Sequence, residues 1–565
     1  MTSRKARIFA LGLLAGGVAL VVAASFRIIA GGLFVPELAS QTLFSLTPGE
    51  VESSSVATLG SLAKYTAFTT AVIINLVLYG GLAILLHELY RKLSDKNTIV
   101  NLIQLSFIPY VVMVAISAIL LQLSELLTGS SEIQYAFLFL LLPNVAYGRT
   151  LSYLFQRDAT NNAKRVKPLN ALNADIDPEA GQRGEKKFEL SRNSSVRRVS
   201  RKQFITMATA VIGVAIFIFW ARTFPFHSKP SMPVSSPKVP LPPPSARIPA
   251  GSIFAQETLA PFVAYELTPN DKFYRIDTNI IVPSVDASSW RLNVKGLLRT
   301  GPVQYTYDEL RAMPSVSEYA TLECISDKVE GDLISTAYWK GVSLKSILEK
   351  AQVLPEAVYI VFRCSDGYDV GIPLDRGLMD GTILAYEMNG VPLPAEHGFP
   401  LRAIVPGLYG MMNAKWITEI ELVDTVYEGF WQRRGWANNA RYQTHSKIVF
   451  PGDALRNRFE ELSTNTATIG SKSPIAGVAF AGDRGISKVE VSIDGGNTWQ
   501  SANIKDPLSN NCWVLWALDW IPQNKGKYNI VVRATDKAGN LQTAEIRDIY
   551  PNGSTGYHSV EETVS

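Results

Sequence analysis

The stretch YATLECISDKVEGDLISTAYWKGVSL, residues 319–344, contains Cys324, one of only three cysteines in 565 residues. Its start is typical of a strand, and Cys324 follows directly, before a short polar turn. No histidine lies close in sequence to serve as the base for a nucleophilic thiol. Two interpretations stay open: a buried thiol that behaves as a small apolar residue, or a thiolate ligand of a metal whose other ligands come from a cofactor.

The composition narrows the class of protein. Cys364 and Cys512 form no CxxC pair and no zinc spacing, and an odd number of cysteines argues against a disulfide framework. We expect both to be buried core residues. The length predicts three or four folding units. A net charge of only +4 gives no support for nucleic-acid binding.

The first 222 residues hold most of the surplus of apolar residues. A segment of about 20 apolar residues can cross a bilayer core. Five segments reach this length, at residues 8–26, 65–86, 97–124, 133–156 and 203–221. We therefore predict a four-helix transmembrane region at 1–156 and a fifth transmembrane helix at 203–222.

The distribution of basic residues predicts the topology, because Lys and Arg favour the cytoplasmic side. The basic loop 157–202 has twelve Lys and Arg against six Asp and Glu, whereas the loops 36–60 and 125–132 have no Lys or Arg. With the basic N-terminus inside, five crossings place everything after Phe224 outside. The chain is expected to be a multi-pass protein of the plasma membrane with an extracytoplasmic C-terminal half.

A basic flank precedes the fifth segment. Residues 200–204 read SRKQF, which resembles a twin-arginine export signal with Lys202 at the place of the second arginine. Such signals export proteins that are already folded around a cofactor. The alternative is an ordinary basic flank of a transmembrane helix.

The C-terminal half begins after a linker at 223–250, whose nine prolines predict a stiff, extended spacer. At 251–430, strand patterns such as SWRLNVKGLL alternate with helix patterns such as TYDELRAM and SLKSILEKA, which predicts a mixed α/β domain. At 431–550, ISKVEVSIDGGNTW and KYNIVVRATDKAGN show strand alternation and a hairpin turn. We predict an immunoglobulin-like β-sandwich there, followed by a tail at 551–565.

Four segments resemble one enzyme family in the same order. The Cys324 stretch, AYEMNGVPLPAEHGFPLRAIVPGLYGMMNAKWITEIEL (385–422), GFWQRRGW (429–436) and AGDRGISKVEVSIDGGNTWQ (481–500) are similar to the sulfite oxidase family of molybdenum enzymes. The resemblance covers roughly residues 255–550. It implies a molybdopterin-binding domain followed by an immunoglobulin-like dimerisation domain.

The resemblance implies a role for each matching residue. Cys324 would be the thiolate on molybdenum, Tyr386 the active-site tyrosine that relays a proton, and Arg484 the sandwich-domain arginine that orients an oxyanion. The residues expected to bind the molybdopterin are His397, Arg402, Gly410, Asn413 and Lys415.

Two departures concern the substrate pocket. In FYRIDT, Arg275 stands one place before the position where the family has an arginine, and Ile276 occupies that position. Val329 replaces a second arginine expected five residues after the cysteine. Both departures weaken the prediction of sulfite as the substrate and leave the prediction of the cofactor intact.

The expected function is oxo transfer on Mo-molybdopterin, with sulfite oxidation to sulfate as the first hypothesis. One alternative is a reductase of S-oxides or N-oxides, since these residues do not reveal redox direction. Another is a non-catalytic membrane adaptor, although an adaptor needs none of the site residues. With no haem or iron–sulfur motif in the chain, electrons are expected to pass to a separate c-type cytochrome or quinone. A homodimer is implied by the resemblance alone.

Overall fold

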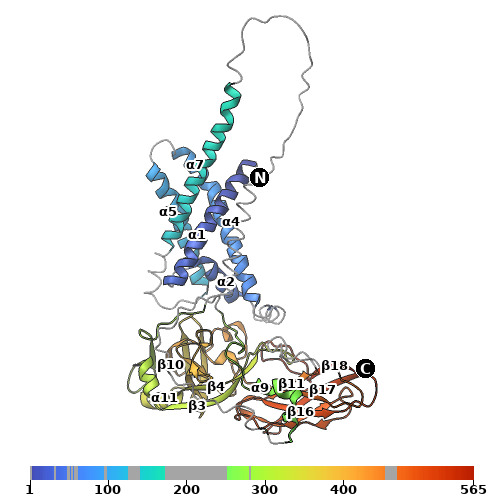
Figure 1. Cartoon of the computed structure of the whole chain (residues 1–565). Coiled ribbons are helices and arrows are strands. Elements are labelled where there is room, and N and C mark those ends of the chain that lie inside the picture. Colours follow the sequence, from blue (N-terminus) through green and yellow to red (C-terminus); the bar gives the residue numbers. More distant parts are fainter. Residues whose placement is uncertain are drawn as a thin grey trace, which may run out of the picture. The chain divides into compact units, whose positions relative to one another are not determined.

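The chain divides into two compact units, Met1–Leu46 with Lys64–Phe226, and Thr47–Ala63 with His227–Ser565. The structure, a computed structural model, describes residues 3–30, 34–47, 51, 55, 62–93, 98–124, 140–171, 248, 251–278, 282–451 and 467–564 (Figure 1). The predicted fifth transmembrane helix, the twin-arginine-like segment and nearly all of the proline-rich linker lie outside these residues.

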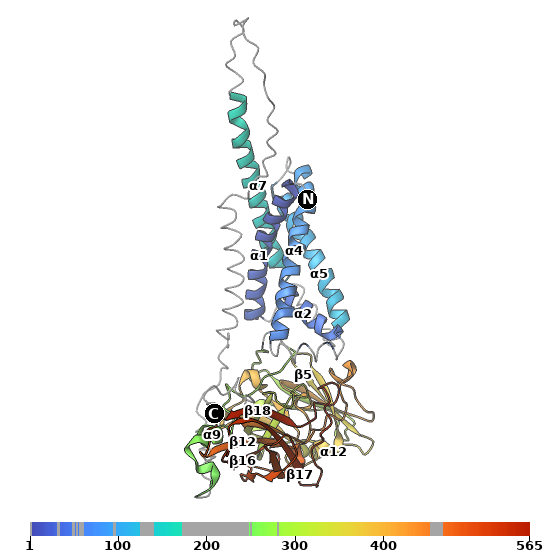
Figure 2. The same cartoon turned by 90° about the vertical axis from the view of Figure 1, so that its right-hand side faces the viewer.

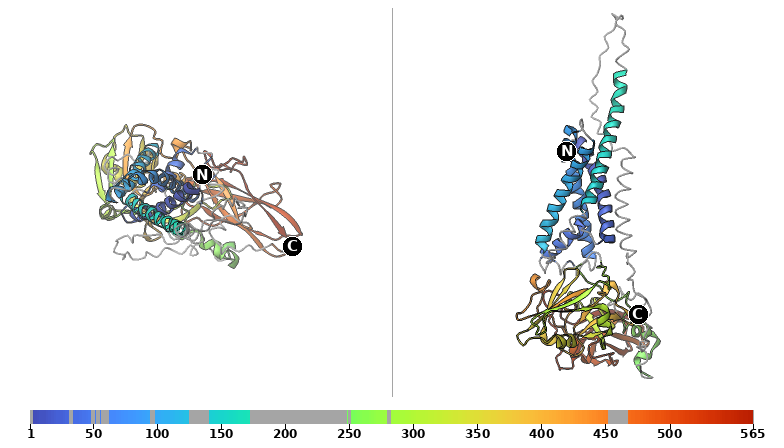
Figure 3. Two further views of the ribbon diagram at one scale, coloured as in Figure 1. Left: turned by 90° about the horizontal axis from the view of Figure 1, so that it is seen from above. Right: turned by 90° about the vertical axis from the view of Figure 1, so that its left-hand side faces the viewer.

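The N-terminal unit is helical. Its described helices are α1 (Ser3–Ala30), α2 (Val35–Leu46), α4 (Leu62–Leu93), α5 (Thr98–Ser124) and α7 (Leu141–Ala171). Figure 2 and Figure 3 show α1, α4, α5 and α7 running side by side. These four coincide with the four apolar segments predicted in this region. The sequence analysis missed α2, which lies in the predicted loop 36–60, and α7 continues past the expected boundary at 156.

Small residues let two of these helices approach closely. A Cβ on Gly12 of α1 would lie 2.4 Å from the Cβ of Ala83 on α4, and a Cβ on Gly16 would lie 2.7 Å from that of Tyr79. Two helical segments, Arg4–Arg27 and Tyr65–Glu88, are long and apolar enough to cross a membrane. Buried core helices and signal sequences meet the same criterion, so the membrane crossing itself stays a proposal.

The second unit begins with a mixed α/β domain built on two sheets. One has the order β2-β1-β10-β5-β6, and the other β3-β4-β7-β8, with β9 paired to β7. The strands are β1 (Arg291–Gly296), β2 (Val303–Thr306), β3 (Ser315–Glu323), β4 (Ile334–Ser343), β5 (Tyr359–Cys364), β6 (Asp369–Pro373), β7 (Ile383–Met388), β8 (Val391–Pro392), β9 (Arg402–Ile404) and β10 (Ile417–Val423).

Short helices precede and connect these strands. They are α9 (Ala260–Ala264), α10 (Tyr307–Ala312), α11 (Leu344–Ala351) and α12 (Leu374–Gly377). The predictions of a strand in SWRLNVKGLL and of helices in TYDELRAM and SLKSILEKA are confirmed by β1, α10 and α11. Mixed α/β is therefore the architecture of this domain.

The C-terminal domain is a sandwich of two four-stranded sheets, β11-β12-β16-β15 and β14-β13-β17-β18. Its strands are β11 (His445–Phe450), β12 (Ser473–Phe480), β13 (Ile486–Ser492), β14 (Gln500–Ser501), β15 (Asn503–Ile504), β16 (Val514–Trp520), β17 (Gly526–Asp536) and β18 (His558–Val564). The prediction of a tail at 551–565 is wrong, because β18 pairs with β17 along its whole length. Only three-dimensional pairing reveals this last strand.

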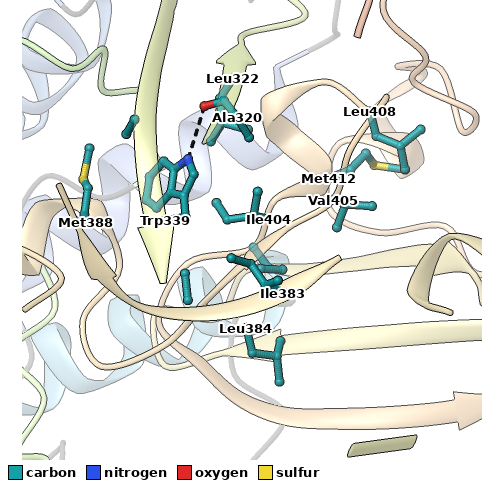
Figure 4. Packing of buried hydrophobic residues seen from close by; sticks show 14 of the residues in the cluster. Ala320, Leu322, Trp339, Ile383, Leu384, Met388, Ile404, Val405, Leu408 and Met412 are labelled. Carbon is teal, nitrogen blue, oxygen red and sulfur yellow. Dashed lines mark hydrogen bonds between the residues drawn. The ribbon is translucent and has the colours of Figure 1, made fainter. Parts of the chain in front are cut away.

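One apolar core spans the α/β domain and reaches into the sandwich, where Phe480 and Trp513 belong to it. Trp339 of β4 lies at its centre and donates its indole N–H to the carbonyl oxygen of Ala320 on β3, at 3.2 Å (Figure 4). The neighbouring sticks in Figure 4 include Ile404 of β9, the strand that carries Arg402, and Met412, which lies between Gly410 and Asn413. This packing gives the site a rigid support.

Candidate active site

Cys324 occupies the first position of the loop between β3 and β4. Its N–H donates to the carbonyl of Leu333 at 2.9 Å, and its own carbonyl accepts from the N–H of Asp327 at 3.0 Å. The thiol is buried, with Sγ 3.0 Å from the hydroxyl oxygen of Ser326. Burial raises the pKa of the Cys324 thiol to about 11. A coordinated metal ion would reverse this, since a thiol that ligates a metal is deprotonated.

Three of the predicted cofactor residues form one buried cationic cluster. Arg402 on β9 donates from Nη1 to the carbonyl of His397 at 3.0 Å, and its guanidinium lies 4.9 Å from the ring centroid of Trp339. Lys415 reaches Asp277 at 3.4 Å. The structure therefore brings His397, Arg402 and Lys415 together, as expected from the resemblance.

Burial disfavours the protonated form of all three basic groups. Burial lowers the pKa of His397 to about 4, with the charges of Arg402 and Lys415 contributing. Burial likewise lowers the pKa of Lys415 to about 8 and that of Arg402 to about 10. A buried group whose charged form is disfavoured gains most from an anionic partner. The cluster is thus suited to hold an anion.

The cluster also has an unused donor. Nε of Arg402 is buried and makes no hydrogen bond with the protein, although buried polar groups nearly always have a partner. Next to it, Gly398 has a φ of +114°, and a Cβ there would lie 3.1 Å from the Cβ of Arg402 and 3.0 Å from that of Lys415. The residues therefore fit an anionic cofactor that comes close to this backbone.

Gly410 and Asn413 belong to the loop between β9 and β10. The Asn413 side chain accepts from the N–H of Val405 at 2.7 Å and donates to the carbonyls of Leu408 and Tyr409 at 3.1 and 3.0 Å. Its amide is thus occupied in shaping the loop. A Cβ on Gly410 would lie 2.2 Å from the Tyr274 hydroxyl, so this backbone approaches the site closely.

Two tyrosines that the sequence analysis did not select lie in this neighbourhood. Burial raises the pKa of Tyr274 and of Tyr442 well above the ordinary value, and the nearby Cys324 thiol adds to the effect in both. Arg402 acts in the opposite direction on both hydroxyls. Tyr274 belongs to the FYRIDT motif, in which the sequence analysis considered only the arginine position. Tyr442 lies in no motif that indicated a role in the site.

Tyr386 requires a correction. It is buried on β7, and its hydroxyl group hydrogen-bonds with Ser315, with Glu387 and Arg311 nearby. Ser315 begins β3, whereas Cys324 follows the other end of this nine-residue strand. At about 3.3 Å per residue the two ends are roughly 26 Å apart. The structure therefore does not bring Tyr386 close to Cys324. The order of the motifs in the sequence does not indicate how far apart their residues lie in space.

Arg484 lies in a 3₁₀ turn of the sandwich, beside the site. It donates from Nε to the Asp536 carboxylate at 2.9 Å and from Nη2 to the carbonyl of Tyr442 and the hydroxyl of Thr444, both at 3.0 Å. Its charge is compensated by Asp536, and its contact with the site runs through Tyr442. Arg275 is similarly paired, with Asp277 at 2.7 Å.

The remaining cysteines are buried, as predicted. Within the part of the chain that the structure describes, no group of three or more His, Cys, Asp or Glu side chains is placed to hold a metal ion. A metal bound at Cys324 would therefore take its other ligands from a cofactor, which is consistent with the cationic cluster nearby.

Comparison with known proteins identifies the family. Residues 279–431 match the oxidoreductase molybdopterin binding domain, and residues 440–563 match the Mo-co oxidoreductase dimerisation domain. Sulfite oxidase from Gallus gallus is 30% identical over 353 residues, which cover 54% of this chain and 75% of that protein. The chain belongs to the sulfite oxidase family.

Two further proteins are similar to shorter parts of the chain. Mitochondrial sulfite oxidase from Macaca fascicularis is 30% identical over 320 residues, 50% of this chain and 58% of that protein. The uncharacterized oxidoreductase YuiH from Bacillus subtilis is 35% identical over 151 residues, 27% of this chain and 74% of that protein. The predicted family and its cofactor, Mo-molybdopterin, are confirmed by the matched binding domain. The helical N-terminal unit lies outside the matched domains.

Proposed function

We propose that this protein is a membrane-anchored oxo-transfer enzyme that oxidises sulfite to sulfate. The observation that carries the proposal is the buried thiol of Cys324 beside a buried cationic cluster with an unused guanidinium N–H. Cys324 would be the protein's ligand to molybdenum, and His397, Arg402 and Lys415 would hold the anionic part of the pterin. When bound, Mo-molybdopterin supplies the two-electron oxo-transfer chemistry.

The protein's own residues bind, orient and exclude water. Tyr274 and Tyr442 keep their protons at neutral pH, since burial raises the pKa of both. They would therefore act as hydrogen-bond donors beside Cys324. Arg484 would affect the substrate anion indirectly, by holding the backbone of Tyr442. Alternatively, its guanidinium would release Asp536 and pair with the anion instead. The loop at Gly410, which closely approaches the Tyr274 hydroxyl, would help to exclude water.

A second candidate is a reductase of S-oxides or N-oxides. It is favoured by the ion pairs of Arg484 with Asp536 and of Arg275 with Asp277, which leave little free positive charge for a dianionic substrate. Val329 contributes no positive charge, because it is a buried apolar residue at the position of an expected arginine. A neutral oxide needs less charge compensation than sulfite. The family match leaves a non-catalytic adaptor without support.

Location and partners complete the proposal. The apolar helices α1 and α4, with α5 and α7, would anchor the protein in the plasma membrane. The basic residues of 157–202 would keep that side of the bilayer cytoplasmic. With the fifth transmembrane helix predicted at 203–222, the catalytic half would then be extracytoplasmic. A c-type cytochrome or a quinone would accept the electrons. The matched dimerisation domain supports a homodimer.

Metal and pterin analysis of the purified full-length protein tests the proposal, followed by a sulfite-dependent acceptor-reduction assay. Cys324→Ser is compared with Cys512→Ser, a matched control because Cys512 is also buried and has a serine partner, Ser509, at 3.5 Å. We expect about one molybdenum per chain in the wild type, and loss of turnover only in Cys324→Ser.

Two results would change the conclusion. Molybdenum without sulfite turnover, but with reduction of an S-oxide by a reduced dye, would favour the reductase. Absence of both molybdenum and pterin, in protein made by a host that synthesises the cofactor, would overturn both enzymatic proposals.

A further inference from the structure

A lysine of the sandwich domain is completely buried against the loop that carries Cys324. Lys447 lies on β11, and its side chain is 0% exposed. Its ammonium group donates to the Asp327 carboxylate and to the carbonyl oxygen of Gly331 at 2.9 Å, and lies 3.8 Å from Oε1 of Glu323. One side chain therefore contacts the last residue of β3 and two residues of the loop that follows it.

Asp327 transmits this contact to the cysteine. Its N–H donates to the carbonyl of Cys324 at 3.0 Å, and its Oδ1 accepts from the N–H of Leu333 at 3.0 Å. Leu333 in turn accepts from the N–H of Cys324 at 2.9 Å. Asp327 therefore ties both sides of the loop together, with its carboxylate as the central acceptor.

Other contacts leave this carboxylate little freedom. A Cβ on Gly331 would lie 2.1 Å from Oδ1 of Asp327, so the loop closes around the carboxylate. Ser554, from the sandwich domain, donates its hydroxyl to the carbonyl of Asp327 at 2.8 Å. Among the described contacts, the sandwich therefore holds this loop through the Ser554 hydroxyl and the charged Lys447 side chain.

Removing the ammonium would leave the buried Asp327 carboxylate without its counter-ion. Among the described contacts, this carboxylate would keep the N–H of Leu333, and Glu323 would keep the His445 ring, with Nε2 3.2 Å from Oε1. A buried ion pair that loses one partner is strongly destabilised, because the remaining charge has neither water nor a counter-ion. The loop would have to open to rehydrate its carboxylates, and this would move the Cys324 backbone.

We propose that Lys447 is a positioning residue for the metal ligand: the sandwich domain supplies the buried ammonium that fixes Asp327, and Asp327 fixes the loop that presents the Cys324 thiol. This inference rests on the proposed function, in which Cys324 binds molybdenum. It makes the C-terminal domain part of the cofactor site, in addition to any role in dimerisation.

The structure provides a matched control. Lys505, also of the sandwich, is 1% exposed and pairs with the buried carboxylate of Glu266 at 2.8 Å. It joins the same two domains but touches no residue of the Cys324 loop among its described contacts. Lys447→Met and Lys505→Met therefore each break a buried ion pair between the domains, and only the first alters the loop. Asp327→Asn is a milder change to the same pair.

The first measurement is the alkylation rate of Cys324 by iodoacetamide, in full-length protein made in a host without the cofactor. Mass spectrometry separates the Cys324 peptide from that of Cys364, the internal reference. We expect Lys447→Met to increase the Cys324 rate by about tenfold or more, because local opening exposes the thiol. Asp327→Asn should change the rate in the same direction, and Lys505→Met should leave it near the wild-type rate.

The second measurement is the Mo(V) electron paramagnetic resonance spectrum of the cofactor-loaded proteins. We expect a changed signal in Lys447→Met and a wild-type signal in Lys505→Met. The proposal is overturned if the Cys324 rate is unchanged in Lys447→Met and Asp327→Asn, or if Lys505→Met increases it equally. If Lys447→Met does not fold, Asp327→Asn decides by the same criteria. If the wild-type protein contains no molybdenum, the proposed function is refuted. The alkylation rates would still test whether Lys447 holds the Cys324 loop in place.

Discussion

At the scale of the residue, burial sets the protonation of the site. His397 donates its Nε2–H to the carbonyl of Asn270 at 2.8 Å, packs edge-on against Phe273, and has its pKa lowered to about 4. In the cofactor-free protein it is therefore neutral at pH 7 beside Arg402. An anion bound to the cluster would raise this pKa, because it would pair with the imidazolium.

The first prediction concerns the acid stability of the cofactor-free protein. The folded-state pKa of His397 is depressed from 6.5 to about 4. The contribution of the neutral imidazole to the free energy of unfolding is therefore fully present above about pH 6.5 and is lost as the pH falls through about 4. The loss is on the order of 3 kcal/mol. His397→Asn should therefore lose less stability than the wild type between pH 7 and pH 4, measured by urea unfolding.

Other histidines do not obscure this comparison. His445 and His558 also have a lowered pKa, of about 3 and about 4, but they are the same in both proteins. Parallel plots of unfolding free energy against pH for the wild type and His397→Asn would show that His397 titrates normally in the folded state.

At the scale of the element, short helices depend on their ends. The six-residue α10 is too short to be stable alone. Its N-terminus has a capping box, in which the Thr306 hydroxyl accepts from the N–H of Glu309 at 3.1 Å and the Glu309 carboxylate accepts from the N–H of Thr306 at 2.8 Å. The helix also places Arg311 beside Tyr386, away from the metal site.

The second prediction is that Thr306→Ala lowers the free energy of unfolding by about 1 kcal/mol, since it removes the side-chain cap. Thr306→Ser keeps the hydroxyl and should retain most of the stability. Chemical unfolding of both variants measures the difference. Equal stability of Thr306→Ala and the wild type would mean that packing alone holds α10.

At the scale of the whole C-terminal unit, the α/β domain and the sandwich share a core. The indole N–H of Trp513 donates to the carbonyl of Glu266 at 3.1 Å, and the rings of Phe262 and Phe450 lie 6.0 Å apart at their centroids. Lys447 and Lys505 add buried ion pairs between the same domains. The two domains of this unit therefore stabilise each other.

The third prediction is that these two domains unfold in one cooperative transition. Lys505→Met should lower the stability of that transition by about 3–5 kcal/mol, because Glu266 loses its buried partner. Calorimetry of the full-length protein measures both the number of transitions in this unit and their shift. Two separate transitions in the wild type, with only the sandwich transition affected by Lys505→Met, would refute the coupling.

The sequence by itself determined the local elements and the family. Alternation and helical spacing predicted β1, α10, α11, β13 and β17, and apolar length predicted four of the N-terminal helices, because these signals reflect short-range backbone geometry. The order of four motifs indicated the cofactor. It also indicated that His397, Arg402 and Lys415 lie together, since they belong to one short stretch of chain that contains the strand β9.

Only the tertiary structure decided which distant residues meet. It separated Tyr386 from Cys324 by the length of β3 and brought Tyr274 and Tyr442 close to the thiol. It packed Lys447 against a loop that lies more than 100 residues earlier in the chain. It also added β18 to the sandwich. Such contacts depend on how two domains pack, and no local periodicity records that packing.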